Sequence, residues 1–144
     1  TDPTSKMSGT NSPDAGVVLL SDDPKRITKK IKSAVTDAEM EIRYDPEHKP
    51  GVSNLLVIQS ALTGVPIPAL EAGYAGQGYG ALKTQVAEVV VAAAEPFQRR
   101  MTELLDDPAE LDRVLARGAE RAGAVSAATL ARVKDRMGLL PAAH

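Results

Sequence analysis

The sequence predicts an all-α protein of about five helices packed as a bundle, preceded by an irregular N-terminal segment. Apolar residues recur at helical spacing, no segment shows sustained alternation of apolar and polar residues, and Asp-Pro pairs stand where helices would begin. With 144 residues, of which 43% are hydrophobic and 25% charged, the chain can bury one core but hardly two. Because it has one Phe, three Tyr and no Trp, that core must be aliphatic.

Several kinds of site are excluded by the composition. Without Cys there can be no disulfide, thiol catalyst or Cys-ligated zinc, and His48 and His144 cannot form a multi-His metal site by themselves. We therefore expect no metal site. No apolar run approaches the roughly 20 residues of a membrane span, which predicts a soluble, cytoplasmic protein without membrane contact. Because the sequence starts at Thr1 without a Met, we expect a piece of a longer protein or a processed product.

The first helix is expected after a loop that is rich in Gly, Ser, Thr, Asn and Pro and extends to Leu20. Asp23 is a good N-cap, and Pro24 suits the first helical position. Apolar residues then recur at helical spacing through Val35 (Ile27, Ile31, Ala34 and Val35). Five cations and no acid occupy the stretch from residue 25 to 32: Lys25, Lys29 and Lys32 form one row, with Arg26 and Lys30 beside it.

Two shorter helices are expected next. Ser53 is positioned to cap a helix over residues 54–63, which Gly64 ends in a left-handed conformation. A short helix over residues 68–74 follows, and a Gly-rich turn at residues 76–80 leads out of it.

The last two helices are long. One follows apolar positions from Leu82 to Leu104, and we expect a kink or break at Pro96, which cannot donate a backbone hydrogen bond. The other begins at the Asp107-Pro108 pair and runs to Gly138. Gly118 and Gly123 weaken it by about 1 kcal/mol each relative to Ala, which suggests close helix contacts at both positions.

Several stretches resemble one family in the family's own order. They are DPTSKMS at residues 2–8, KKIKSAVTD at 29–37, IRYD at 42–45, KPGVSNLL at 49–56, GYG at 78–80 and the stretch from residue 110 to 119. Together they resemble the C-terminal part of bacterial tryptophanyl-tRNA synthetase, a class I aminoacyl-tRNA synthetase. The resemblance implies that residues 1–20 are the end of a Rossmann catalytic domain and that residues 21–144 form a helical anticodon-binding domain.

Such an enzyme activates tryptophan with ATP and transfers it to its tRNA. The family's signature loop KMSKS corresponds to Lys6, Met7, Ser8, Gly9 and Thr10, which would bind ATP. Lys6 would be catalytic, since an ammonium group stabilises the charge that builds as pyrophosphate leaves. Gly9 replaces the second lysine of the motif, and Thr10 replaces its last Ser. On the tripeptide Lys-Met-Ser alone, Lys6 would be a solvated surface lysine.

The resemblance also bears on ligands and assembly. We expect ATP and Mg²⁺ to serve the complete enzyme and no cofactor to be bound by this chain. The chain alone is expected to be inactive, because the HIGH-type motif and the tryptophan pocket are missing from it. A homodimer is implied for the complete enzyme, and a monomer is expected for this chain.

Candidate tRNA contacts fall in two places. Lys25, Lys29, Lys30 and Lys32 could neutralise phosphates, although a solvated helix face would show the same pattern and the net charge is -2. Asp37, which follows Thr36, and Arg43 could read the edges of splayed anticodon bases, or form an ion pair with each other.

Other polar residues have plainer interpretations. Tyr74 and Tyr79 are interpreted as packing residues with surface hydroxyls, and His48 as solvated. Arg113, Arg117 and Arg121 share a helix face and are expected to pair with Glu110 and Glu120.

A function of another class fits the same residues. The chain could be a non-catalytic, synthetase-derived helical module that binds a protein partner, and Gly9 in place of the motif lysine favours that alternative. The salt dependence of tRNA binding separates the two, since contacts with phosphates weaken as salt rises.

Overall fold

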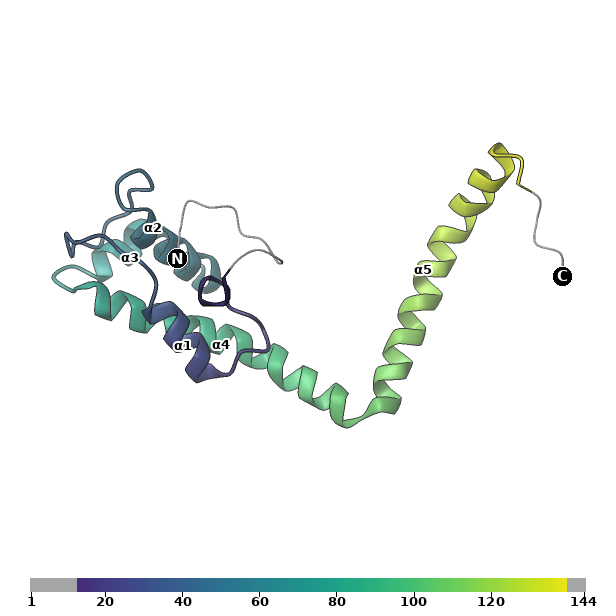
Figure 1. Cartoon of the computed structure of the whole chain (residues 1–144), viewed down its shortest axis with the longest axis horizontal. Helices are drawn as coiled ribbons and strands as arrows, with labels where there is room; N and C mark the ends of the chain where they lie inside the picture. The colour runs from purple at the N-terminus through teal and green to yellow at the C-terminus, as the bar shows by residue number, and fades with distance from the viewer. Residues whose placement is uncertain (1–12, 140–144) are drawn as a thin grey trace. The chain divides into compact units, whose positions relative to one another are not determined.

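The computed structural model describes residues 13–139, and over these residues it contains five α-helices and no β-strand (Figure 1). This confirms the all-α prediction. The helices are α1 (Pro24–Lys32), α2 (Pro50–Thr63), α3 (Ile67–Gly73), α4 (Tyr79–Asp106) and α5 (Pro108–Arg136), and a 3-10 turn, η1 (Asp14–Gly16), precedes them. The signature-like loop at residues 6–10, including Lys6, lies outside the described residues.

The chain divides into two compact units between Arg99 and Arg100, within α4. The first unit holds α1, α2, α3 and the larger part of α4, and the second holds the end of α4 and α5. The division predicted near residue 20 stays a prediction. Over the described residues, the segment from residue 14 to 22 contacts α1 of the first unit.

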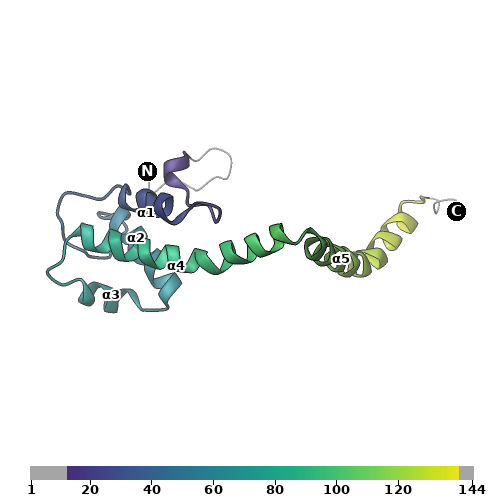
Figure 2. The same cartoon turned by 90° about the horizontal axis from the view of Figure 1, so that it is seen from below.

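A core of mainly aliphatic side chains joins the helices of the first unit, as the composition predicts, although Tyr74 and Tyr79 also belong to it. α1, α2 and the first half of α4 lie side by side around it (Figures 1 and 2). The fully buried side chains in its centre are apolar residues from three helices: Ile27, Val52, Leu55, Leu56, Leu82 and Val86. Burying a side chain of this size stabilises the fold by about 1.5–3 kcal/mol. The cluster therefore holds α1 in place and determines which side of this helix is exposed.

The first helix starts as predicted. The Asp23 carboxylate accepts hydrogen bonds from the backbone N–H groups of Lys25 and Arg26, at 2.9 and 3.0 Å, and Pro24 occupies the first turn. The helix ends at Lys32, before Val35, whose side chain is exposed.

The second helix starts four residues earlier than predicted, at Pro50. The predicted cap at Ser53 is wrong: Ser53 is buried, and its hydroxyl accepts a hydrogen bond from the backbone N–H of Asp45 at 2.8 Å. Because Pro suits the first turn of a helix, Pro50 rather than Ser53 marks the start. Gly64 ends α2 in the left-handed conformation, with φ 74°, as predicted.

The sequence predicted a kink or a break at Pro96. The long helix α4 continues through this residue, so there is no break. Pro96 lies on an exposed part of the helix, where the carbonyl that loses its donor can accept from water.

The last helix runs over Pro108–Arg136, and Gly138 follows with φ 68°. The Asp107 side chain accepts from the N–H of Glu110 at 3.0 Å, which confirms the predicted cap. The close contacts expected at Gly118 and Gly123 are wrong: among the described residues, and apart from the neighbouring backbone of α5 itself, no atom lies within 4 Å of where a Cβ would stand at either. No residue of α5 is buried.

Along residues 13–139, no single helix is long and apolar enough to cross a membrane. α2 and α3 reach the required length and composition only as a pair, which is bent by 109°. Their apolar character has another explanation, since α2 turns Val52, Leu55 and Leu56 into the core.

Candidate nucleic-acid interface

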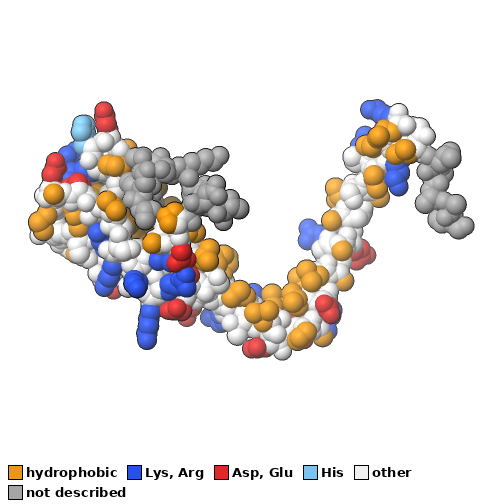
Figure 3. Space-filling view, in the orientation of Figure 1, with side chains coloured by type: hydrophobic (Ala, Val, Ile, Leu, Met, Phe, Trp, Pro, Cys, Tyr) orange, Lys and Arg blue, Asp and Glu red, His pale blue; other side chains and the backbone are white. Residues whose placement is uncertain are grey.

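The exposed face of α1 presents a row of three lysines. Lys25, Lys29 and Lys32 are all exposed, and the spacing of four and three residues places them on one side of the helix. None of the three forms an ion pair with a described carboxylate. Figure 3 shows blue Lys and Arg side chains gathered over the region of α1. This lysine row (Lys25, Lys29 and Lys32) can therefore meet phosphates without first breaking a contact within residues 13–139.

Lys30 differs from the lysine row with which its sequence position groups it. It lies about 140° around the helix axis from Lys25, and its side chain is only 7% exposed. The ammonium group donates to Asp22 Oδ2 and to the Val17 carbonyl, each at 2.7 Å, and to Asp14 Oδ1 at 3.1 Å. An ammonium group has three N–H donors, so Lys30 has no donor left for a phosphate.

Asp37 lies in the loop between α1 and α2, where it accepts several hydrogen bonds through one oxygen. Oδ1 accepts from the Lys49 ammonium at 2.9 Å, from the backbone N–H of Glu39 at 2.9 Å and from the Tyr79 hydroxyl. Oδ2 is buried and lacks a hydrogen-bond partner among the described residues. Burial alone would raise the pKa of Asp37, but the bonds from Tyr79, Lys49 and Glu39 outweigh it and lower the pKa to about 2.

Lys49 holds this loop from the start of α2. Its side chain is 1% exposed, and its ammonium donates to Asp37 at 2.9 Å and to the Tyr79 hydroxyl at 3.1 Å, and pairs with Glu39 at 2.7 Å. Burial would lower the pKa of Lys49, but Glu39, Asp37 and Tyr79 raise it. We call Lys49, Asp37, Glu39 and Tyr79 the Lys49 cluster. Sequence reasoning missed Lys49, because nothing in its local sequence distinguishes it from a solvated lysine.

Arg43 and Asp37 do not form the ion pair considered as an alternative. Arg43 pairs instead with Asp45, and with Glu41 at 3.4 Å. The donation from the backbone N–H of His48, followed by that from Arg43, lowers the pKa of Asp45. The His48 side chain is 71% exposed, in agreement with its interpretation as solvated. Arg43 is 44% exposed, so it is the more accessible of the two candidate base readers.

Tyr74 and Tyr79 are buried, which confirms that they are packing residues. The expectation that their hydroxyls lie at the surface is wrong. Tyr74 donates to Gln59 Oε1 at 2.8 Å, and Tyr79 donates to Asp37. A buried hydroxyl needs a partner, and each tyrosine finds one on another element. Neither ring is free to stack on a base.

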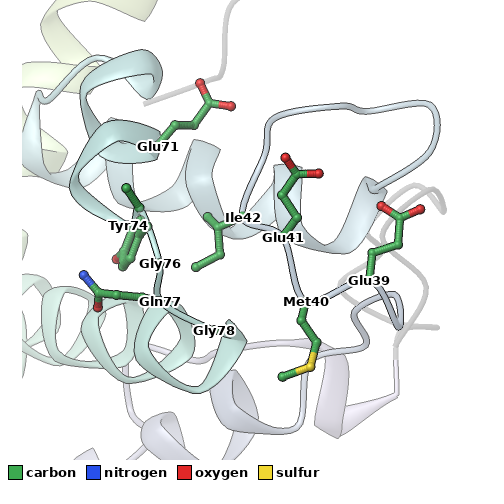
Figure 4. A pocket seen from close by; sticks show the side chains of 10 residues that line it. Glu39, Met40, Glu41, Ile42, Glu71, Tyr74, Gly76, Gln77 and Gly78 are labelled. Atoms are coloured by element: carbon green, nitrogen blue, oxygen red, sulfur yellow. The ribbon is translucent and has the colours of Figure 1, made fainter.

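An open pocket of about 530 Å³ lies beside the loop between α1 and α2 (Figure 4). Its walls come from residues 39–42 on one side and from Glu71 and residues 74–78 on the other. Met40, on its rim, has φ 65°, a left-handed conformation that is uncommon for a residue other than Gly, Asn or Asp. The carboxylates of Glu39, Glu41 and Glu71 give the pocket an acidic rim, which disfavours phosphate there.

Side chains that could ligate a metal ion are not grouped together over residues 13–139. Within the described part of the chain, no group of three or more His, Asp or Glu side chains is arranged to hold a metal ion.

The arginines of α5 are partly neutralised within their own helix. Glu110 accepts from Arg113 at 2.8 Å and from Arg117 at 3.3 Å, as predicted. Hydrogen bonds from these two arginines lower the pKa of Glu110. Over residues 13–139, the other expected partners, Arg121 and Glu120, form no ion pair.

Comparisons with known proteins agree on one family. Residues 1–95 match the family model of class I tRNA synthetases for tryptophan and tyrosine (W and Y). The chain is 57% identical over 143 residues to tryptophan–tRNA ligase 2 of Streptomyces avermitilis, covering 99% of this chain and 42% of that protein. It is 57% identical over 140 residues to the tryptophan–tRNA ligase of Mycobacterium leprae, covering 97% of this chain and 41% of that protein.

A solved structure shares the fold. The crystal structure of tryptophanyl-tRNA synthetase from Mycoplasma pneumoniae matches with a TM-score of 0.82 at 32% identity, over 96% of this chain and 42% of that chain. The chain thus spans about two fifths of the length of the curated relatives it matches.

Proposed function

Because the chain belongs to the class I tRNA synthetases for tryptophan and tyrosine, and is homologous to the bacterial tryptophanyl enzymes, we propose that it supplies the tRNA-binding surface of a tryptophan–tRNA ligase. The substrates of that ligase would be tryptophan, ATP and tRNA. The observation that supports this role is the lysine row of α1. It concentrates positive charge that has no ion-pair partner within residues 13–139 on one helix face of a chain whose net charge is -2.

The lysine row would bind the phosphate backbone. Three ammonium groups along one helix face neutralise phosphates and release counterions, which gives affinity but no discrimination between sequences. Lys30 is left out of this set, because its donors are used by Asp14, Val17 and Asp22.

Arg43 and Asp37 would contribute to base recognition in different ways. The Arg43 guanidinium is accessible and can donate to a base edge or stack on a base once it leaves Asp45. Asp37 would hold the loop through Oδ1, whereas Oδ2, which has no hydrogen-bond partner among the described residues, is buried and out of reach of a base. Its role is therefore proposed to be mainly that of fixing the loop that carries Arg43.

The signature-like loop would act on ATP. Lys6 would stabilise the charge that develops on pyrophosphate, and Met7, Ser8, Gly9 and Thr10 would complete the loop. Mg²⁺ would enter with ATP. We expect the 144-residue chain alone to show no ATP–pyrophosphate exchange, and robust turnover by it would contradict this proposal.

The tRNA-binding role is tested by titrating the chain with tryptophan tRNA at several salt concentrations. We expect the logarithm of the affinity to fall linearly with the logarithm of the salt concentration. Replacing Lys25, Lys29 and Lys32 together by Gln should reduce the slope by about 2 to 3, since each phosphate contact contributes about 0.7–0.9. Replacing Arg113, Arg117 and Arg121 by Gln provides a control with the same change of net charge.

The alternative function, binding of a protein partner, predicts another outcome. Under it, the wild-type chain would bind tRNA weakly, and the two triple variants would lose affinity equally because only net charge would matter.

A further inference from the structure

The chain segment just before α1 is fastened to the first unit by a buried ion pair that none of the roles above uses. The Lys30 ammonium lies 2.7 Å from Asp22 Oδ2, and the two side chains are 7% and 4% exposed. Lys30 also donates to the carbonyl of Val17 and to Asp14, so it contacts three points of the segment from residue 14 to 22. All three donors of this ammonium group are directed at one stretch of chain.

Two further side chains complete the attachment. Arg26 pairs with Asp14 at 2.8 Å and with Asp22 at 3.0 Å. From α4, Gln98 donates to the carbonyls of Leu20 and Asp22, at 3.0 and 2.9 Å. We call Lys30 with Asp14, Val17, Asp22 and Arg26 the Lys30 clamp. It holds residues 14–22 against α1 at their start, middle and end.

The place of this segment in the sequence gives the Lys30 clamp a function. Residue 14 stands four positions after Thr10, the last residue of the signature-like loop, and Asp22 is followed directly by the cap of α1. We propose that Lys30 and Asp22 are positioning residues. They hold in place the segment that connects the ATP-binding loop to α1, the helix that carries the tRNA-binding lysine row. This inference rests on the proposed function and deepens it.

The short helix α1 connects the lysine row to residues 14–22 through Lys30. The helix has nine residues, and the lysine row and Lys30 lie on different sides of it. A displacement of α1 by bound tRNA would therefore move residues 14–22 with it. Without the Lys30 clamp, residues 14–22 would lose these contacts with α1, and holding their ends in place would carry an entropic cost.

Two variants and one control test the proposal. Lys30→Met removes the three donors and keeps an unbranched apolar side chain, whereas Lys29→Met removes a charge from the exposed neighbour. Lys30→Met/Asp22→Leu removes both buried charges, a change that is often neutral for stability. We therefore expect the double variant to stay folded even if Lys30→Met does not. It loses the bond to the Val17 carbonyl and leaves Asp14 with only its contact to Arg26 among those described above.

The first readout is amide hydrogen exchange of the 144-residue chain. We expect exchange over residues 14–22 to rise by about tenfold or more in Lys30→Met and in the double variant, while α2 and α4 stay protected. Lys29→Met should leave that exchange unchanged. Unchanged exchange over residues 14–22 in the double variant would overturn the proposal.

The second readout separates positioning from a merely structural role. In a synthetase of the relatives' full length that carries this sequence, the double variant should raise the KM for ATP by about tenfold and leave the KM for tryptophan unchanged. An unchanged KM for ATP beside faster exchange would overturn the positioning role. Failure of the proposed function would look different, because the wild-type chain would then show no salt-dependent binding of tRNA.

Discussion

The two units of the molecule use charged residues in opposite ways. In the first unit, Lys30 and Lys49 are buried, and each ammonium group is surrounded by three acceptors or carboxylates. In the second unit, every residue of α5 is at least partly exposed, and its ion pairs link side chains on a helix surface. Buried cations thus anchor loops in the first unit, whereas Arg113 and Arg117 of α5 pair along the surface of their own helix.

The exposed rows of cations differ between the units as well. The lysine row of α1 has no described carboxylate partner, whereas Arg113 and Arg117 share Glu110. Free cations attract phosphates more strongly than cations that already have a carboxylate at contact distance. A basic row is therefore a candidate phosphate-binding surface only where neighbouring carboxylates leave its charge unpaired.

The largest expected difference between the units is in stability. Leu82→Ala removes a side chain with 0% exposure from the core of the first unit, and we expect it to lower the free energy of unfolding by about 3 kcal/mol. Leu115→Ala, at a position 61% exposed in α5, should change it by less than about 0.5 kcal/mol. Urea unfolding followed by circular dichroism measures both. Equal losses would mean that α5 packs in solution as tightly as the core.

A second prediction concerns the buried cation of the Lys49 cluster. Lys49→Met keeps the apolar stem but leaves Asp37 and Glu39 without their shared cation, so we expect Tm to fall by about 8 °C or more. Arg113→Met, which removes an exposed cation from α5, should lower Tm by less than about 2 °C. Thermal unfolding at pH 7 measures both. If Lys49→Met unfolded no earlier than Arg113→Met, the Lys49 cluster would not stabilise the fold.

The sequence predicts the helices better than it predicts these clusters. Helix starts at Asp23 and Asp107 and the helix end at Gly64 follow from capping and turn chemistry, which acts within four residues. The Lys49 cluster joins residues up to 42 positions apart in the sequence, and no local pattern records such contacts.

The candidate site was predicted only in part for the same reason. Four of the five cations of α1 were grouped as tRNA contacts, yet only Lys25, Lys29 and Lys32 lack an ion pair within residues 13–139, whereas Arg26 is paired and Lys30 is buried. Helical spacing alone separates Lys30 from the row, but it does not reveal the acceptors in residues 14–22 that bury it. The resemblance to the synthetase family supplied the expected function, which the periodicity of the sequence could not.

A third prediction follows from the pKa of Asp37. The folded value of about 2 lies below the ordinary value of 3.8, so the contribution of Asp37 to stability is present above pH 3.8. It is lost as the pH falls from about 4 to 2 and the carboxylate becomes protonated. Asp37→Asn should lower stability at pH 7 and flatten the loss of stability between pH 4 and 2. Urea unfolding at a series of pH values measures this.

The matched control for Asp37 comes from the other unit. Glu110→Gln should leave the acid profile of the first unit close to that of the wild type, because within residues 13–139 the Glu110 carboxylate forms ion pairs with arginines of α5. An acid profile of Asp37→Asn identical to the wild type would show that Asp37 is not held by Lys49 and Tyr79 in solution.

The smallest expected effect compares one cation from each exposed row. Lys29→Gln should weaken binding of tryptophan tRNA by a few fold at low salt and reduce the salt slope by about 0.7–0.9, because one phosphate contact is lost. Arg117→Gln makes the same change of charge at a position already paired with Glu110, so it should change neither quantity beyond a general charge effect. Fluorescence anisotropy over a salt series resolves the two slopes. If Arg117→Gln reduced the slope as much as Lys29→Gln, pairing with Glu110 would not keep α5 from RNA, and the contrast between free and paired cations would fail as a guide to the binding surface.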